Sequence, residues 1–124
     1  MKESKSNDKK LELIPKLEKY IQYMIEVIIK LPRTEKFSIG NEYKISMYKT
    51  INYVMYLNKL EDSKCLYYAN MLDAEINVQR IYLRIMYKNR WIDDKKLKVS
   101  MEQIYEIGKI LGGLIKYYAK NNKK

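Results

Sequence analysis

The sequence predicts an all-α protein, an antiparallel up-down-up-down four-helix bundle. Four segments repeat apolar residues at alternating steps of three and four, as the amphipathic helices of a bundle do. Only four Gly and two Pro interrupt the chain, which disfavours a β fold with many turns. Its 124 residues, 47% of them hydrophobic, suffice for one domain with its own core. The connections are short, so consecutive helices should run antiparallel.

The first two helices are expected over residues 13–31 and 36–59. Pro32 ends the first, and Thr34 or Ser38 can cap the second. The first helix is apolar over most of its circumference, so it must be covered on more than one side. Either its apolar residues flank a broad core, or they form a subunit interface, which is the hypothesis we prefer.

The third and fourth helices are expected over residues 63–90 and 100–121. In the third, the apolar step runs almost unbroken from Cys65 to Met86 and places Gln79 in the core register. The capping candidates of these helices are Asp62 or Ser63 for the third, and Ser100 with Gln103, at capping-box spacing, for the fourth.

The polar ends of the chain indicate tails around a single domain. We expect residues 1–10 to be a flexible tail, residues 11–121 to be the bundle, and residues 122–124 to be a lysine-rich tail. No apolar run approaches a membrane span, and the N-terminus lacks the apolar stretch of a signal peptide. The single cysteine permits no intrachain disulfide. These features predict a soluble, cytoplasmic protein.

Chemistry for catalysis is sparse. The chain has no histidine, which excludes His-based triads and ordinary zinc sites. Cys65 falls in the core register of the third helix and is expected to be a packed small hydrophobe. The acidic pairs Glu61–Asp62 and Asp93–Asp94 fall in predicted loops. We therefore expect a protein that is not an enzyme and needs no cofactor or metal.

The positive charge is clustered. Residues 76–92 and 107–124 contain no acid and together carry +9 of the net charge of +10. Charge distributed in this way indicates a polyanionic partner such as nucleic acid. The alternative is that the basic end of a helix complements its dipole and stays solvated. The candidate nucleic-acid-binding residues are Arg33, Arg80, Arg84, Lys88, Arg90, Lys109, Lys116 and Lys120.

Arg80, Arg84 and Lys88 recur every four residues, so they should form a ladder along one face of the third helix. Tyr82 and Tyr87 beside the ladder could stack on bases. In the fourth helix, the glycines at 108, 112 and 113 are costly and predict close approach by another helix. An antiparallel bundle would carry positive charge at both ends.

Three stretches, LPRTEKFSIGNEYK (31–44), LYYANMLDAEINVQRIYLR (66–84) and EIGKILGGLIKYYAK (106–120), resemble the Avd family. These are accessory proteins of diversity-generating retroelements, related to four-helix proteins encoded in intervening sequences of bacterial 23S rRNA genes. The resemblance covers residues 12–120. Arg80, Arg84, Lys109 and Arg33 match basic positions of the family. Relatives often have Trp after the glycine pair, where this chain has Leu114.

The resemblance implies a non-enzymatic, homopentameric ring that associates with a reverse transcriptase and binds RNA and DNA. In that role it would support mutagenic cDNA synthesis. The runner-up is a stand-alone protein of the rRNA-intervening-sequence branch, which binds RNA without a polymerase. A third alternative, a basic protein of the membrane surface, is less favoured because its cations lie on a packed helix.

Overall fold

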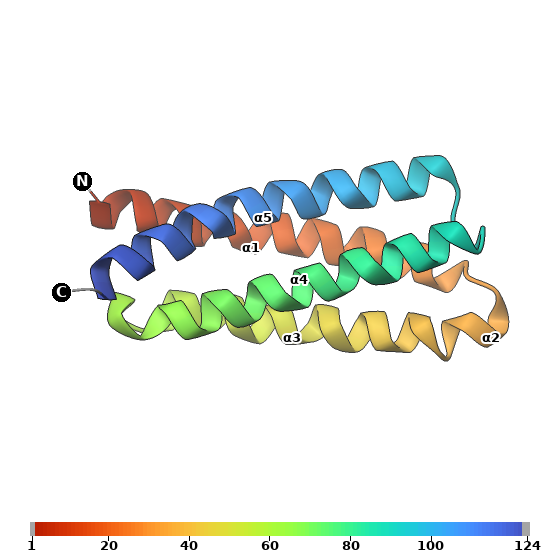
Figure 1. Ribbon diagram of the computed structural model, residues 1–124, viewed down its shortest axis with the longest axis horizontal. Coiled ribbons are helices and arrows are strands. Elements are labelled where there is room, and N and C mark those ends of the chain that lie inside the picture. The colour runs from red at the N-terminus through yellow and green to blue at the C-terminus, as the bar shows by residue number, and fades with distance from the viewer. Residues whose placement is uncertain (1, 123–124) are drawn as a thin grey trace.

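Four long helices form an antiparallel bundle, and the all-α prediction is confirmed (Figure 1). The computed structural model describes the backbone of residues 2–122 and the side chains of residues 7–122. The elements are α1 (Lys2–Ile29), α2 (Arg33–Lys36), α3 (Ile39–Lys59), the 3-10 helix η1 (Asp62–Lys64), α4 (Cys65–Lys88) and α5 (Asp94–Asn122).

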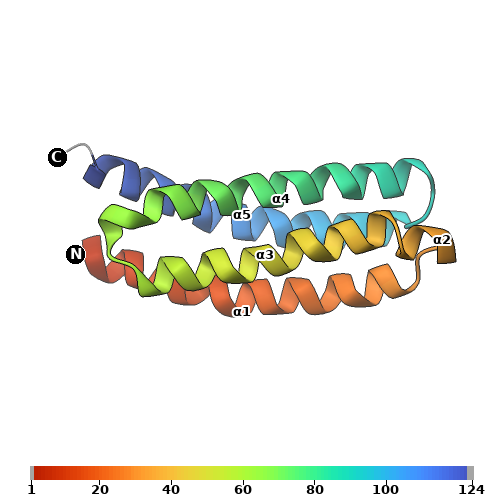
Figure 2. The same ribbon diagram turned by 90° about the horizontal axis from the view of Figure 1, so that it is seen from below.

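The bundle places α1 diagonally across from α4. Both of these helices pack against α3 and α5, as the two perpendicular views show (Figures 1 and 2). The start of α1, the end of α5 and η1 meet at one end of the bundle. At the opposite end lie α2 and the connection from α4 to α5. This arrangement decides which basic segments are neighbours.

The first helix begins at Lys2 and not near residue 13. The apolar pattern did not predict this extension, because the inward-facing position that precedes Leu13 is Lys10, which is only 6% exposed. A lysine can bury its aliphatic stem while its ammonium finds a polar partner. Pro15 lies inside α1 on an exposed position. Of the predicted lysine-rich tail, residues 122–124, Asn122 is still helical and the other two residues lie outside the described part of the chain.

The predicted caps are largely wrong. Helix α5 begins at Asp94, and Asp93 caps it by accepting a hydrogen bond from the Lys96 backbone N–H at 2.8 Å. Ser100 is fully buried within the helix, where its hydroxyl donates to the Lys96 carbonyl. Ser38 precedes α3, but its side chain makes no capping hydrogen bond. The cap of α5 is therefore the carboxylate of Asp93, and Ser100 lies inside the helix.

A buried polar network crosses the core and joins three helices. The Tyr20 hydroxyl donates to Gln79 Oε1 at 2.6 Å and shares a hydrogen bond with the Tyr43 hydroxyl. Gln79 Nε2 donates to Ser46 Oγ at 2.9 Å, and Ser46 donates to the Glu75 carboxylate. Burial raises the pKa of both tyrosines above the ordinary value, so both stay protonated. Gln79, predicted in the core register, is fully buried.

Two of the three glycines of α5 make room for long cationic side chains, where the sequence had predicted an approaching helix. A Cβ at Gly108 would lie 3.0 Å from Arg80 Nη2, and one at Gly113 would lie 2.7 Å from Lys9 Nζ. Gly112 has nothing within 4 Å. Close packing of helix backbones therefore does not explain these glycines.

Replacing Gly112 by Ala should raise the free energy of unfolding by about 1 kcal/mol, because the methyl group enters open space and the helix gains propensity. The control is Gly40→Ala in α3. A Cβ at Gly40 would lie 3.1 Å from both the Glu35 carbonyl oxygen and Ile28 Cγ2, so no gain is expected there. Urea unfolding at equal protein concentrations measures both. A destabilised Gly112→Ala variant would contradict the prediction.

Most of the apolar breadth of α1 packs within the chain, although Leu11 and Ile29 are exposed. Tyr20, Met24, Val27 and Ile28 are all at most 3% exposed, which agrees with the alternative that they flank a broad core. Exposed large apolar side chains gather instead on α3 and α4. They are Ile45, Tyr48, Ile51, Met55 and Tyr56 on α3, and Tyr67, Val78, Ile81, Ile85 and Tyr87 on α4.

Candidate nucleic-acid interface

The eight predicted cations are exposed, except for Arg80, which is half-buried. Among residues 7–122, ion pairs join Lys10 to Asp62, Lys16 to Glu106, and Lys64 to Glu61. None of the eight candidates belongs to these pairs. Their charges are therefore not neutralised by direct contact with a carboxylate of the described part of the chain.

Arg80 and Lys109 line a shallow hollow between α4 and α5. Arg80 donates to Asn77 Oδ1 at 2.6 Å, and its guanidinium lies over Gly108. Glu102 and Glu106 of α5 line the same hollow. Of the acid-free row predicted for α4, Arg80 thus faces carboxylates of a neighbouring helix, which partly offset its positive potential.

The predicted ladder turns around α4 and is not a straight row. At 3.6 residues per turn, each four-residue step advances by about 40°. Arg80 therefore faces α5, Arg84 is exposed, and Lys88 lines a different hollow. Tyr82 is half-buried, with its ring centroid 6.0 Å from that of Tyr43, so it packs against the core and does not flank an open ladder.

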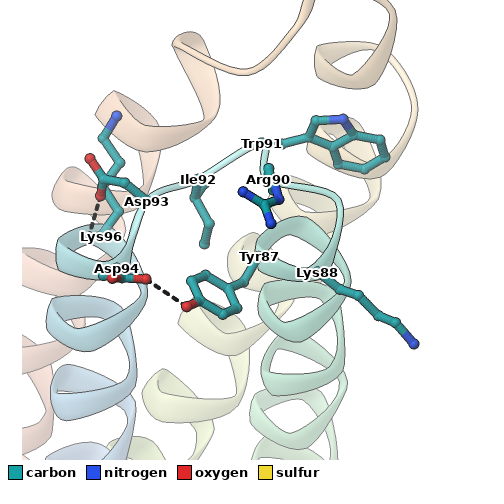
Figure 3. A pocket seen from close by; sticks show the side chains of 8 residues that line it. All are labelled: Tyr87, Lys88, Arg90, Trp91, Ile92, Asp93, Asp94 and Lys96. Carbon is teal, nitrogen blue, oxygen red and sulfur yellow. Dashed lines mark hydrogen bonds between the residues drawn. The ribbon is translucent and has the colours of Figure 1, made fainter.

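A second hollow, of about 770 Å³, lies at the connection between α4 and α5 (Figure 3). Two predicted cations, Lys88 and Arg90, line it. Two further members of the lining, Lys96 and Trp91, were not predicted, although the run DDKKLK after the only tryptophan was a signal. The complete lining is Tyr87, Lys88, Arg90, Trp91, Ile92, Asp93, Asp94 and Lys96.

Both carboxylates of this hollow are engaged in local hydrogen bonds. Asp93 accepts from the Lys96 backbone, and Asp94 accepts from the Tyr87 hydroxyl at 2.5 Å. The hydrogen bond to Asp94 and the negative charge of that carboxylate raise the pKa of Tyr87 above its usual value. The acids therefore stabilise the start of α5 and the join between the two helices.

The remaining candidates are divided between the ends of the bundle. Arg33 opens α2, at the same end as the hollow around Arg90. Lys116 and Lys120 lie on the last turns of α5, at the end where α1 begins. The eight residues thus do not form one continuous patch on a single chain, but each end of the bundle carries exposed positive charge.

A half-buried ionic cluster at the start of α1 was not predicted. Lys10 Nζ lies 3.0 Å from Asp62 Oδ1 and 5.6 Å from the ring centroid of Tyr118. Tyr117 donates to Asp62 Oδ2 at 2.7 Å. Burial alone would raise the pKa of Asp62, but the hydrogen bonds from Tyr117 and Lys10, with the Lys10 charge, lower it overall. The cluster therefore contributes stability at neutral pH, which is lost as pH falls through that lowered pKa.

Cys65 is fully buried, as the sequence predicted. Burial raises the pKa of its thiol, which disfavours the reactive thiolate. Within residues 7–122, no group of three or more His, Cys, Asp and Glu side chains could hold a metal ion. In this part of the chain, no helix is both long enough and apolar enough to cross a bilayer.

A family model described as bAvd-like matches residues 11–118, which span nearly all of the bundle from the first turns of α1 to the last turns of α5. A comparison with curated proteins gives no match.

Proposed function

Because the chain belongs to the bAvd-like family, we propose that it is a basic, nucleic-acid-binding accessory protein that partners a reverse transcriptase. Membership suggests an accessory variability determinant of a diversity-generating retroelement, and Avd proteins are non-catalytic. In this role it binds RNA, DNA or both in the cytoplasm and supports mutagenic cDNA synthesis by the polymerase.

The observation that carries the proposal is the exposed positive charge without carboxylate contacts on α4 and α5. Arg84, Lys88, Arg90, Lys109 and Lys116 are exposed and belong to none of the ion pairs of residues 7–122. Free cations of this kind bind phosphates and release condensed counterions, which drives association with a nucleic acid.

Binding of labelled RNA and DNA across a salt series tests the first part of the proposal. The logarithm of the affinity should fall linearly with the logarithm of the salt concentration. Affinity that is weak and independent of salt would contradict nucleic-acid binding. Capture of the retroelement's reverse transcriptase by the tagged chain tests the partnership. RNA binding without such capture would favour the stand-alone rRNA-intervening-sequence alternative.

We also propose that the chain assembles into a homopentameric ring, as the family resemblance implies, with subunits meeting on α3 and α4. The exposed apolar side chains concentrate on these two helices, and contiguous exposed apolar surface marks an interaction site. Most of the apolar breadth of α1 is covered within the bundle, with Leu11 and Ile29 exposed. Native mass spectrometry should find a five-subunit species, and a monomer that is stable to dilution would contradict the ring.

A further inference from the structure

Arg90 occupies a backbone conformation that favours glycine. Its φ of 62° is the only positive φ of a non-glycine residue in the described part of the chain. Its N–H donates to the Tyr87 carbonyl and the N–H of Trp91 donates to the Met86 carbonyl, each at 2.9 Å. These two hydrogen bonds end α4 in a Schellman turn, where glycine is usual because a side chain is strained. An arginine held in this strained conformation is a candidate for a functional role of its guanidinium.

Trp91 follows Arg90 directly and is half-buried. It is the only tryptophan of the chain, and it packs partly against the core while lining the hollow. Figure 3 shows its ring projecting from the connection on the α4 side, with Arg90 between this ring and Asp94. The half-buried indole beside a guanidinium offers the exposed part of a flat ring and a positive charge to one ligand.

The charges of the hollow favour an anion. Lys88, Arg90 and Lys96 belong to no ion pair of residues 7–122. The two carboxylates, in contrast, already accept hydrogen bonds from Tyr87 and from the backbone of Lys96. Lys88 and Lys96 point to opposite sides of the hollow (Figure 3). A chain of phosphates could therefore cross this end of the bundle from α4 to α5.

We propose that this hollow binds an unpaired nucleotide of a single-stranded nucleic acid, with the base stacked on Trp91 and neighbouring phosphates held by Lys88, Arg90 and Lys96. The inference rests on the proposed nucleic-acid-binding function and names the class of strand. Aromatic side chains next to a basic track are the general means of binding single strands. In a duplex the bases are stacked on one another and leave no free face for the indole.

Trp91 itself reports the contact, because all tryptophan fluorescence of the chain comes from it. The full chain is titrated with oligo(dT) of about 12 nucleotides, within the range of single-strand site sizes, and with an abasic oligonucleotide and a duplex of the same length. Fluorescence anisotropy of the labelled nucleic acids measures binding separately. Saturable quenching by oligo(dT), with little quenching by the abasic strand or the duplex, is the expected result.

Two variants separate binding from folding. Arg90→Gly relieves the strained backbone, so this variant should unfold at a higher temperature. It also removes the cation, so the slope of log affinity for oligo(dT) against log salt should fall by about 0.7. Trp91→Leu should weaken oligo(dT) binding by about fivefold or more. The control is Lys19→Gln, which removes one exposed charge from α1, diagonally across the bundle from α4. It should change neither the unfolding temperature nor the binding of oligo(dT).

The outcomes distinguish this inference from the proposed function. Tight binding without quenching, with Arg90→Gly indistinguishable from Lys19→Gln, would overturn the site at the α4–α5 connection and leave nucleic-acid binding intact. Equal quenching by oligo(dT) and the duplex would overturn the preference for a single strand. Absence of binding to every oligonucleotide would overturn the proposed function, and the inference with it.

Discussion

Reversing two exposed charges, one on α4 and one on α5, with Arg84→Glu and Lys109→Glu together, is expected to weaken the binding of duplex DNA about 100-fold at about 0.1 M salt. On duplex DNA each phosphate contact contributes about 0.9 to the slope of log affinity against log salt, compared with about 0.7 on a single strand, so one duplex contact is worth about eightfold at this concentration. Loss of two contacts gives about 60-fold, and repulsion by the new carboxylates adds to it. The salt slope should fall by about 1.8.

The two residues are chosen because both are exposed and neither belongs to an ion pair of residues 7–122. Arg80 is a poorer choice, since a carboxylate at this half-buried position would lie beside Glu102 and Glu106 and disturb the packing of α4 on α5.

The matched control for this pair is Lys19→Glu with Lys30→Glu. It changes the net charge equally, at exposed positions of α1 or immediately after it, on the helix that lies diagonally across from α4. Salt titrations by anisotropy compare the two double variants, and circular dichroism verifies that both remain folded. An equal loss of affinity in both would show that net charge alone attracts the nucleic acid and that the α4–α5 face is not the interface.

The four-helix bundle was predictable because most inward positions carry apolar side chains at helical spacing. The predicted boundaries failed where polar residues took over that role. Lys10 continues the buried face of α1 through its aliphatic stem, and Ser100 fills a buried position in α5. Neither counts as apolar, so both helices were predicted too short. Whether a polar residue can occupy a buried position depends on a hydrogen-bond partner, and the sequence pattern does not show that partner.

The exposure of the predicted cations followed from their charge, whereas their surroundings could not be predicted. The sequence around Arg80 contains no acid over residues 76–92. Glu102 and Glu106 belong to α5, and they reach Arg80 only because the two helices pack together. The turn at Arg90 could not be predicted, because the glycine that normally marks such a turn is absent. Trp91 then joins the site only as a consequence of that turn.

Replacing Gln79 by Leu is expected to lower the free energy of unfolding by about 2–4 kcal/mol, a large share of the stability of a small domain. Leucine nearly fills the volume of the side chain but removes both the acceptor of the Tyr20 hydroxyl and the donor to Ser46. The two groups stay buried, so each loses hydrogen bonding that water cannot replace. Urea unfolding at fixed protein concentration measures the loss.

A double-mutant cycle with Tyr20→Phe isolates the cause. In Tyr20→Phe/Gln79→Leu the hydroxyl that would be left with fewer partners is also absent, so the double variant should be destabilised by less than the sum of the single variants, with a coupling of about 1 kcal/mol or more. Strict additivity would show that the loss comes from packing and not from the hydrogen bond. Because Gln79 directly precedes Arg80 on α4, the same network fixes the rotation of that helix and therefore which cations face α5.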